Sequence, residues 1–530
     1  MTKNREGLRM ENLIKYPLGQ QDFKTLRNLG YLYVDKTQYI ERILQGGQYI
    51  FLARPRRFGK SLFLSTLQCF FEGERELFKG LAAYSIDWNW ESYPVLRLDL
   101  NSNTYEEPGR LDSVLNTTFS EWESKYGINT VESDYSQRFR RIIKAAHEYT
   151  GRQVVILVDE YDKPLVANIN NRKNIEHYRD RLSSIYSNFK SSAEHIRFVF
   201  LTGVSRFSKL SVFSDLNNLV DITFVDDYAD ICGITEREML DNLQSGITKL
   251  AEVNGISEDE ARSQLKRNYD GYRFAEKGSD IYNPWSLLSA MNNSKITNYW
   301  NDTGLPRLLA EALKRVHADL ESMFDTYCTD DDLKGLDLLS PQPLALLYQT
   351  GYLTIKSYHP KIRRYRLGIP NNEVKEGLFK VLLPYYVKCH SDDEPKRLIS
   401  DMVMYFILGE ADKAMKCMQS YFAGVHFKMK IGNENNFHNA FYLLMDIVGL
   451  DTETESATSD GSIDITIKTD DYIYVIELKY DGSAEQALRQ IEEKKYVRKF
   501  SMDGRKIICI GVNFSSKTRC IEDWKIEFID

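Results

Sequence analysis

The segment YIFLARPRRFGKS (49–61) runs from an unbroken apolar stretch into a basic turn that ends in Gly-Lys-Ser. Residues 49–53 predict a buried strand, and the apolar spacing of SLFLSTLQCFFEG (61–73) predicts a helix after the turn. At such a strand-to-helix turn, backbone N–H groups and the helix N-terminus can hold phosphate. The segment therefore predicts a phosphate-binding loop (P-loop) in an α/β domain.

The loop residues predict an ATP site with Mg²⁺. Lys60 is expected to reach the β- and γ-phosphates and Ser61 to bind Mg²⁺, although Arg54 replaces the first glycine of the usual G-x-x-x-x-G-K-[ST] pattern. The arginines either neutralise phosphates, contact a partner strand or form a solvated charge cluster. The predicted nucleotide-contacting residues of the loop are Arg54, Arg57, Phe58, Gly59, Lys60, Ser61 and Leu62.

Acidic residues follow a second apolar run, VVILVDEYD (154–162). We expect Asp159 to hold Mg²⁺ and Glu160 to orient or deprotonate the attacking water, since neighbouring strand residues point in different directions. A solvated strand end is the alternative. Thr202, which closes the next apolar run, is a candidate γ-phosphate sensor, and Arg206 a candidate for stabilising transition-state charge from the same or a neighbouring subunit. A structural role is equally open for these two.

The pattern of apolar runs predicts a parallel sheet covered by helices, of the RecA/AAA type of P-loop NTPase. The segment 344–370 reads as a helix followed by a two-stranded hairpin, which suits a winged-helix lid. The predicted strands are 49–53, 94–100, 154–160 and 197–203, with helices at 61–73 and 137–149. The predicted parts are an N-terminal tail and cap (1–45), an ATPase domain (46–245), a helical and winged-helix lid (246–395), a helical connector (396–431) and a second α/β domain (432–530).

The last part carries two carboxylates and a lysine on adjacent predicted strands. SIDITIK (462–468) alternates, so Asp464 points away from the isoleucine face, and YIYVIELKY (472–480) predicts a central strand with Glu477 and Lys479 on one face. Metal-dependent phosphodiester cleavage needs oxygen ligands for Mg²⁺ and a group that activates water, which these three residues supply. A structural Glu477–Lys479 salt bridge is the alternative.

Two further residues complete the predicted constellation. Glu434, at the start of an apolar helical stripe over 433–449, is a candidate metal ligand, and Gln490 in the following helix is a candidate contact to a nucleic-acid backbone. The predicted metal ligands of the whole chain are Ser61, Asp159, Glu434, Asp464 and Glu477.

Composition limits the other classes of protein. The 530 residues have a net charge of -7, which argues against a broadly basic nucleic-acid coat but leaves room for a local basic groove. Because the sequence has neither a membrane-length apolar run nor a signal-peptide pattern, we expect a cytoplasmic protein without a membrane partner. Seven scattered cysteines without a C-x-x-C pair make disulfides and structural zinc unexpected.

Taken together, these stretches resemble the AAA-ATPase-like family whose members carry a C-terminal PD-(D/E)XK nuclease-superfamily domain. The resemblance runs from about residue 16 to residue 528, and the missing first loop glycine is a trait of that family. The matching stretches are YPLGQQDF (16–23), GYLYVDKT (30–37), RPRRFGKS (54–61), VILVDEYDKPL (155–165), LTGVSRFSKLSVFSDLNNL (201–219), YDGYRF (269–274), YNPWSLL (282–288), NENNFH (433–438) and DGSIDITIKTDDYIYVIELKYDGSAEQALRQIEEKKY (460–496).

The chain departs from the related nucleases at two places. Ser462 stands where family members often have an arginine, which alters a possible phosphate contact. Related nucleases also pair a glutamine and a tyrosine one helical turn apart, whereas Gln490 and Tyr496 are six residues apart and lie off one helical stripe. Tyr496 is therefore not expected in the site.

The resemblance implies an ATPase and metal-dependent nuclease that uses ATP and Mg²⁺, with DNA as the expected partner and a homo-oligomer as a possibility. Nucleotide state would regulate the nuclease, with defence or mobile-element control as the suggested setting. The alternative is a switch similar to STAND-type ATPases, whose C-terminal domain binds a partner without cutting. A third reading makes the basic segment KIRRYR (361–366) a DNA-binding hairpin, against a solvated hairpin.

Overall fold

A computed structural model describes most of the chain. The described residues are 14–101, 104–129, 134–168, 171–206, 218–300, 324–334, 342–378, 394–423, 444, 451–458, 461–518 and 520–529. The chain divides into two compact units, which we name unit 1 (1–300 with 325–374) and unit 2 (301–324 with 375–530).

Unit 1 is built on a five-stranded parallel sheet with the order β2-β3-β4-β1-β5. The two strands that precede the predicted functional turns, β1 and β3, are buried at every residue, which explains their unbroken apolar runs. All four predicted strands are present, and the α/β class is confirmed. The strands are β1 (Tyr49–Ala53), β2 (Val95–Asp99), β3 (Val154–Asp159), β4 (Ile196–Gly203) and β5 (Val220–Asp221).

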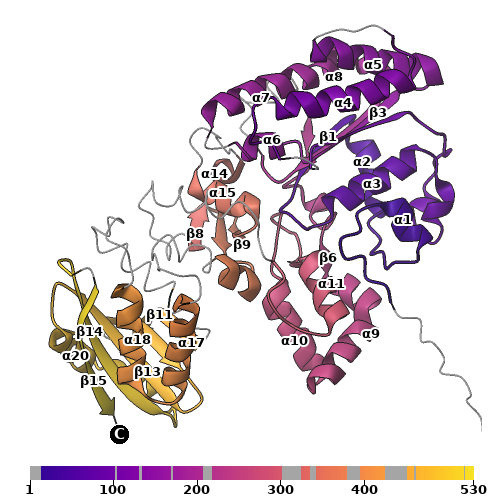
Figure 1. Ribbon diagram of the computed structural model, residues 1–530. Coiled ribbons are helices and arrows are strands. Elements are labelled where there is room, and N and C mark those ends of the chain that lie inside the picture. The colour runs from indigo at the N-terminus through magenta and orange to yellow at the C-terminus, as the bar shows by residue number, and fades with distance from the viewer. Residues whose placement is uncertain are drawn as a thin grey trace, which may run out of the picture. The chain divides into compact units, whose positions relative to one another are not determined.

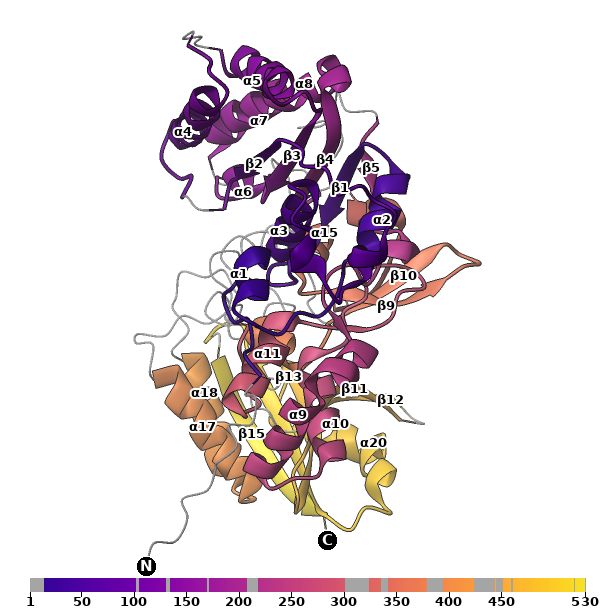
Figure 2. The same cartoon turned by 90° about the vertical axis from the view of Figure 1, so that its right-hand side faces the viewer.

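Helices cover both faces of this sheet. Figures 1 and 2 show α4, α5 and α7 on one side and α1, α2 and α3 on the other. The predicted helices at 61–73 and 137–149 correspond to α3 and α5. The helices are α1 (Phe23–Asn28), α2 (Gln38–Gly46), α3 (Lys60–Phe71), α4 (Arg110–Lys125), α5 (Tyr135–Thr150), α6 (Lys163–Val166), α7 (Arg172–Tyr186) and α8 (Asn188–Ser191), with 3₁₀ turns η1 (Arg75–Phe78), η2 (Ala82–Ser85), η3 (Ala193–His195) and η4 (Asp226–Tyr228).

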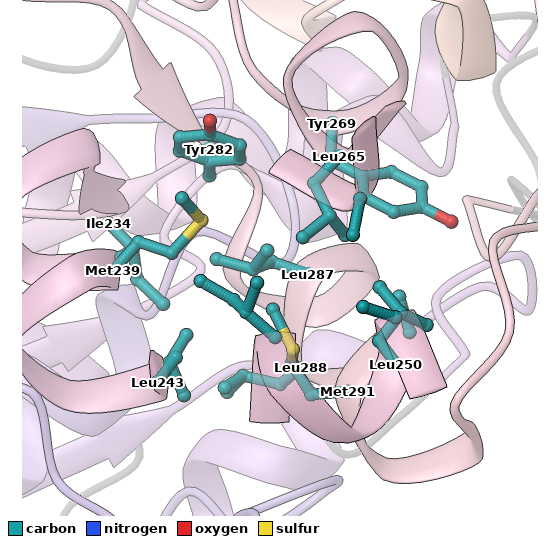
Figure 3. Packing of buried hydrophobic residues seen from close by; sticks show 14 residues of the cluster. Ile234, Met239, Leu243, Leu250, Leu265, Tyr269, Tyr282, Leu287, Leu288 and Met291 are labelled. Carbon is teal, nitrogen blue, oxygen red and sulfur yellow. The ribbon is translucent and has the colours of Figure 1, made fainter. Parts of the chain in front are cut away.

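A helical part follows the sheet within unit 1. The helix α9 starts at a capping box, in which the Thr235 side chain and the Glu238 side chain each bind the other residue's backbone N–H. Its core, drawn in Figure 3, joins α9, α10 and α11 through buried apolar side chains. The elements are β6 (Ile234–Thr235), α9 (Glu236–Asn254), α10 (Glu258–Tyr269), β7 (Ile281–Tyr282) and α11 (Pro284–Asn293).

The segment read as helix plus hairpin forms as expected. The helix α15 leads into the antiparallel hairpin β9–β10, which Figure 2 shows projecting outward, and β8 adds a third strand beside β10. The elements are β8 (Asp325–Cys328), α14 (Asp330–Lys334), α15 (Pro343–Thr350), β9 (Thr354–His359) and β10 (Arg364–Gly368).

Unit 2 contains a mixed five-stranded sheet with the order β11-β12-β13-β14-β15, in which only the β13–β14 pair is parallel. Figure 2 shows α17 and α18 on one face and α20 on the other. As predicted, β13 is central. The elements are α17 (Glu394–Ile407), α18 (Ala411–Ala423), β11 (Asp451–Thr458), β12 (Gly461–Lys468), β13 (Tyr472–Tyr480), α20 (Ala484–Glu493), η5 (Tyr496–Phe500), β14 (Lys506–Ser515) and β15 (Cys520–Ile529).

The helix expected over 433–449 lies outside the described residues except for Leu444. None of the described helices combines the length and the apolar character that crossing a membrane requires. The predicted domain boundaries stay a prediction.

Candidate nucleotide and nuclease sites

The loop between β1 and α3 has the backbone that a phosphate cradle needs. Gly59 caps α3 with a φ of 96°, and Arg57 also lies in the left-handed region with a φ of 68°. Nothing lies within 4 Å of the position that a Cβ on Gly59 would occupy, so the backbone conformation and not space favours glycine there. The N–H of Gly233 donates to the Phe58 carbonyl at 3.0 Å and ties the loop to the chain ahead of α9.

The predicted lysine and the predicted water-activating acid lie together. Lys60 is only 4% exposed, and its Nζ lies 3.2 Å from Glu160 Oε1 and donates to the Pro55 carbonyl at 3.2 Å. Glu160 directly follows β3 and has a φ of 51°, which turns its side chain towards the loop end. Each group therefore balances the other's charge in this arrangement.

Asp159 lies at the end of β3 and is almost fully buried. Burial, followed by the charge of Glu160, raises the pKa of its carboxyl to about 6, while a hydrogen bond with Ser61 and the charge of Lys60 act in the opposite direction. Arg97 Nη2 on β2 lies 4.0 Å from Asp159 Oδ2. The other oxygen, Oδ1, is buried and has no hydrogen-bond partner among the described residues.

The structure brings Lys60, Ser61, Asp159 and Glu160 together, but the Thr202 and Arg206 side chains bind elsewhere. The Thr202 hydroxyl donates to the Leu52 carbonyl at 2.9 Å. The Arg206 guanidinium forms an ion pair with Asp221 of β5. The roles predicted for Thr202 and Arg206 at the nucleotide phosphates stay predictions. Each side chain would first have to leave its present partner, Leu52 or Asp221.

Arg54 has a packing role that its sequence position did not predict. Its guanidinium is 1% exposed and donates to the carbonyls of Thr223 at 2.8 Å and Tyr228 at 3.0 Å. It also stacks over the Phe274 ring, 4.5 Å from the centroid. These contacts hold the side chain in the protein interior, and the predicted contact of Arg54 with phosphate stays a prediction that would require the side chain to leave them.

Arg57 and Phe58 connect the loop with the helical part. Arg57 donates to the Tyr299 carbonyl at 2.8 Å and lies 5.1 Å from the centroid of the Trp285 ring. Phe58 is buried and meets the Tyr272 ring edge-on, with the ring centroids 4.8 Å apart. The loop is therefore packed against residues about two hundred positions later in the chain.

Asp162 was missed as a site residue, although it lies in the same acidic segment. Its carboxylate accepts the N–H groups of Val204 at 3.2 Å and Ser205 at 2.6 Å, the residues that lead from β4 to Arg206. Burial and then the charge of Glu160 raise its pKa to about 6. Its place in the acidic segment that follows β3 is a sequence signal that could have found it.

In unit 2, the residues predicted for phosphodiester cleavage meet on one face of the sheet. Asp464 on β12 accepts the N–H of Leu478 on β13 at 2.8 Å. Glu477 and Lys479 lie on the same face of β13, with Nζ 3.2 Å from Glu477 Oε1. The Lys479 ammonium also donates to Gln490 Oε1 at 2.7 Å, so α20 contributes to the same cluster.

Glu477 combines burial with an unused oxygen. It is 1% exposed, and burial followed by the charge of Asp464 raises its pKa to about 7, with Lys479 acting in the opposite direction. Its Oε1 accepts from both Lys479 and Gln490. Its Oε2 is buried and has no hydrogen-bond partner among the described residues.

Tyr496 belongs to this cluster, contrary to the expectation from helical spacing. Its hydroxyl lies 3.4 Å from Gln490 Nε2, and the charges of Glu477 and Asp464 contribute to its raised pKa after burial. The helix α20 ends at Glu493, and Lys495 takes a left-handed conformation with a φ of 52° that starts a 3₁₀ turn. The six-residue spacing was misleading because it assumed one continuous helix.

Comparison with known proteins finds a family match for each of the two parts of the chain. Residues 17–213 match the family described as "Predicted AAA-ATPase", and residues 432–524 match the "PD-(D/E)XK nuclease superfamily". An "Uncharacterized protein in vnfD 5'region" from Azotobacter chroococcum mcd 1 is 34% identical over 527 residues, covering 97% of this chain and 99% of that protein. The chain belongs to the family of predicted AAA-ATPases with a C-terminal PD-(D/E)XK nuclease-superfamily domain.

Membership in this AAA-ATPase and nuclease family suggests the use of nucleotide and a divalent metal, and the residues fit both. In each candidate site one buried carboxylate oxygen, Asp159 Oδ1 or Glu477 Oε2, has no hydrogen-bond partner among the described residues, and a cation would satisfy it. Within the described residues no group of three or more His, Cys, Asp or Glu side chains is arranged around a metal position. Mg²⁺ commonly binds through one or two carboxylates plus water and substrate phosphate, so two carboxylates suffice. Glu434 lies outside the described residues.

Proposed function

We propose that the chain binds and hydrolyses ATP with Mg²⁺ in unit 1, and that its nucleotide state regulates a Mg²⁺-dependent DNA nuclease in unit 2, in defence or mobile-element control. The proposed nuclease activity rests on Glu477 Oε2, which is buried beside Asp464 and Lys479 and has no hydrogen-bond partner among the residues that the structure describes. A purely structural Glu477–Lys479 pair would leave that oxygen desolvated without compensation.

For ATP hydrolysis, Lys60 binds the β- and γ-phosphates and Glu160 takes the proton of the attacking water. Ser61 and Asp159 hold the Mg²⁺, which neutralises phosphate charge. The Lys60–Glu160 ion pair supports a coupled step, because phosphate that attracts Lys60 also frees the Glu160 carboxylate. Thr202 and Arg206 join the site only if ATP draws them from Leu52 and Asp221.

For DNA cleavage, Asp464 and Glu477 bind the metal, and Glu434 is the proposed third ligand. Lys479 lies beside Glu477 and activates water or stabilises charge on the phosphate. Gln490 holds Lys479 and Glu477 in place and, when it exchanges one of these bonds, contacts the DNA backbone. Tyr496 positions Gln490 through its hydroxyl.

Regulation within unit 1 is supported by contacts between the sheet and the proposed winged-helix lid. Gln349 of α15 accepts the N–H of Arg206 at 2.9 Å and donates to the Leu333 carbonyl at 2.9 Å. A movement of Arg206 towards phosphate would therefore pull on α15. An in-trans role of Arg206 would instead require a homo-oligomer.

The test is DNA cleavage by the purified full chain, with linear, circular and single-stranded DNA, Mg²⁺ or Mn²⁺, and with or without ATP. Asp464→Ala should abolish cutting, whereas Asp471→Ala, which removes an exposed acid from the β12–β13 turn, should not. Lys60→Ala should change only the response to ATP, and Lys79→Ala serves as its exposed control.

Metal-dependent cutting that survives Asp464→Ala would refute the assignment of the nuclease site. Intact ATP hydrolysis without any cutting would favour the alternative, an ATP switch whose unit 2 binds a partner without cleaving it. Equal cutting by the wild-type chain and Lys60→Ala at all ATP concentrations would refute regulation by nucleotide.

A further inference from the structure

A small cavity of about 20 Å³ lies in unit 1 beside the helix α15, and we call it the α15 cavity. On this measure one water needs roughly 10–15 Å³, so the space suits one water-sized particle and is too small for sulfate or phosphate. Its walls include the chain at the end of β1 (53–55), the chain after β4 (204 and 206) and α15 (348 and 349). Lys60 and Asp159 are not among the described residues that line it, so it is distinct from the proposed ATP site.

Arg54 brings a buried positive charge to the α15 cavity. Its guanidinium donates to the carbonyls of Ala53 at 2.9 Å, Thr223 at 2.8 Å and Tyr228 at 3.0 Å, and the Phe274 ring covers one face of it. None of these partners is a carboxylate, and burial is the largest influence on the pKa of Arg54, which it lowers. A buried cation that only neutral groups surround is costly, because nothing replaces the water that stabilised its charge.

Three side chains that line the α15 cavity each have a buried polar atom that lacks a hydrogen-bond partner among the described residues. These atoms are Arg54 Nε, Arg206 Nη1 and the Tyr348 hydroxyl oxygen. The two guanidinium nitrogens can only donate, and the hydroxyl can donate as well. A water accepts at most about two hydrogen bonds and brings two protons that need acceptors, whereas a monatomic anion can accept all three bonds. The unused donors therefore favour an anion.

The charges around the α15 cavity leave one positive charge to balance. Arg206 forms its ion pair with Asp221 through Nε, so these two residues are neutral together and Nη1 stays available. The described residues that line the cavity include no acidic side chain, and the charge of Arg54 therefore remains. One monovalent anion would neutralise it. Because the space is the size of one water, that anion has to be monatomic, which indicates a halide.

We infer that the α15 cavity binds one halide ion, such as chloride, through Arg54, Arg206 and Tyr348. The ion links the ends of β1 and β4 with α15, where Gln349 already accepts the N–H of Arg206 at 2.9 Å. It thus adds a charged contact between the sheet and the helix that leads into the β9–β10 hairpin. The inference goes beyond the proposed function and stands without it, since it uses these side chains in the positions that they have here, away from Lys60.

The experiment measures chloride binding to the purified full chain without nucleotide. Sodium chloride replaces sodium gluconate at constant ionic strength, and the width of the chloride nuclear magnetic resonance line reports bound ion, because an ion held by a large protein relaxes fast. We expect broadening that saturates as chloride rises, that bromide reverses and that sulfate leaves unchanged. In the same series the midpoint of thermal unfolding should rise by about 2–4 °C, since only the folded chain has the site.

One hydroxyl is the sharpest variant, because it removes a donor and keeps the packing. Tyr348→Phe retains the ring that stacks on Phe224, with the centroids 5.8 Å apart, and should weaken chloride binding by about tenfold. Tyr327→Phe on β8, where the side chain is 52% exposed, is the matched control and should bind chloride as the wild-type chain does. Lys60→Ala separates the two sites, since chloride on the phosphate-binding loop would be lost in this variant and chloride in the α15 cavity would be kept.

Equal broadening by the wild-type chain and Tyr348→Phe would overturn the inference, as would broadening that is lost in Lys60→Ala. No saturable broadening in the wild-type chain would overturn it as well and would leave water as the occupant of the α15 cavity. If Tyr348→Phe fails to fold, competition in the wild-type chain decides: displacement of chloride by sulfate would overturn the inference, because sulfate does not fit a cavity of this size. None of these results bears on ATP hydrolysis or DNA cleavage, so the proposed function is tested separately.

Discussion

The two candidate sites place their acidic residues differently on their sheets. In unit 1, Asp159 and Glu160 lie where β3 ends, and Lys60 reaches them from the neighbouring loop and helix. In unit 2, Asp464 and Glu477 lie within two antiparallel strands and face the same side. Both arrangements leave one buried carboxylate oxygen without a partner among the described residues.

The difference shows what each site depends on. The unit 1 site depends on backbone conformation, because left-handed φ values at Arg57, Gly59 and Glu160 bend the chain around the place for phosphate. The unit 2 site depends on strand register and on α20 lying close to the sheet, since a one-residue slip would turn Glu477 to the other face. A side-chain substitution, a change of packing or a change of pH should therefore affect the activity or the stability of one site and not of the other.

The largest expected effect is on ATP hydrolysis, which we place in unit 1 alone. Glu160→Gln should lower ATP hydrolysis by about 10²–10⁴-fold, because it removes the proposed base, while MgATP still binds. DNA cleavage without ATP should be unchanged, since the nuclease residues lie in unit 2. Phosphate release, nucleotide binding and DNA cleavage should be measured on the same preparation, with Glu176→Gln, a partly exposed acid on α7, as the control. Undiminished hydrolysis would mean that Glu160 only balances Lys60.

The next effect tests the dependence of unit 2 on packing. A Cβ on Gly511 of β14 would lie 2.2 Å from the Ala484 carbonyl oxygen and 2.8 Å from the Leu488 nitrogen, both in the backbone of α20. Gly511→Ala should destabilise unit 2 by about 1–3 kcal/mol, because α20 must move away from the sheet. Amide hydrogen exchange of β14 and α20 in increasing urea measures this for unit 2 alone, whereas tryptophan fluorescence would not, since five of the six tryptophans lie in unit 1.

Gly504→Ala is the matched control, because nothing lies within 4 Å of the Cβ position and the φ of Gly504 is not left-handed. A shift of α20 also moves Gln490, so Gly511→Ala should reduce DNA cleavage and leave ATP hydrolysis intact. If both glycine variants are equally stable, α20 is not held to the sheet as closely as the structure indicates.

A smaller effect concerns pH and metal binding. Because the pKa of Glu477 is raised to about 7, a proton competes with the metal below that pH. Mn²⁺ affinity should therefore be about tenfold weaker at pH 6 than at pH 8, as one pH unit below the pKa changes the ionised fraction about tenfold. Electron paramagnetic resonance titrations in an Asp159→Asn background would isolate the unit 2 site. Affinity that does not change with pH would argue against Glu477 as a ligand.

The sequence was most informative where one continuous segment builds a feature. The apolar runs of β1 and β3 predicted buried strands, and the apolar run of residues 472–480 predicted the central strand β13. The segment DTETESAT (451–458) was not predicted to be a strand, since it is polar and forms β11 only by pairing with β12. Whether such a polar segment forms a strand depends on its pairing with the neighbouring strand, which the segment's own residues do not indicate.

Contacts between distant segments were the part that could not be predicted. The burial of Arg54 depends on the carbonyls of Thr223 and Tyr228, which no local pattern connects with the loop. Likewise, the return of Tyr496 to the nuclease site depends on the left-handed conformation of Lys495, a residue type that seldom adopts it. Local periodicity predicts helices and strands, but contacts between residues that are distant in the sequence depend on how those helices and strands pack.

The smallest expected effect sharpens the contrast between a site carboxylate and a structural one. Glu373, 3% exposed, accepts the N–H groups of Tyr299 at 2.5 Å and Trp300 at 2.9 Å, and burial raises its pKa to about 7 from 4.5. Between these values the folded chain holds a proton that the unfolded chain has lost, so stability falls as pH rises from 4.5 to 7 and the full cost remains above pH 7.

Glu373→Gln removes this titration and keeps an oxygen that can accept the same N–H groups. It should therefore stabilise unit 1 by about 1 kcal/mol at pH 8 and change little at pH 4.5. Thermal unfolding across this pH range measures the difference, with exposed Glu252→Gln as the control. A stability gain that is equal at both pH values would show that Glu373 is not protonated in the folded chain at low pH. Its burial would then need a permanent countercharge, for which Arg57, whose charge lowers the pKa of Glu373, is a candidate.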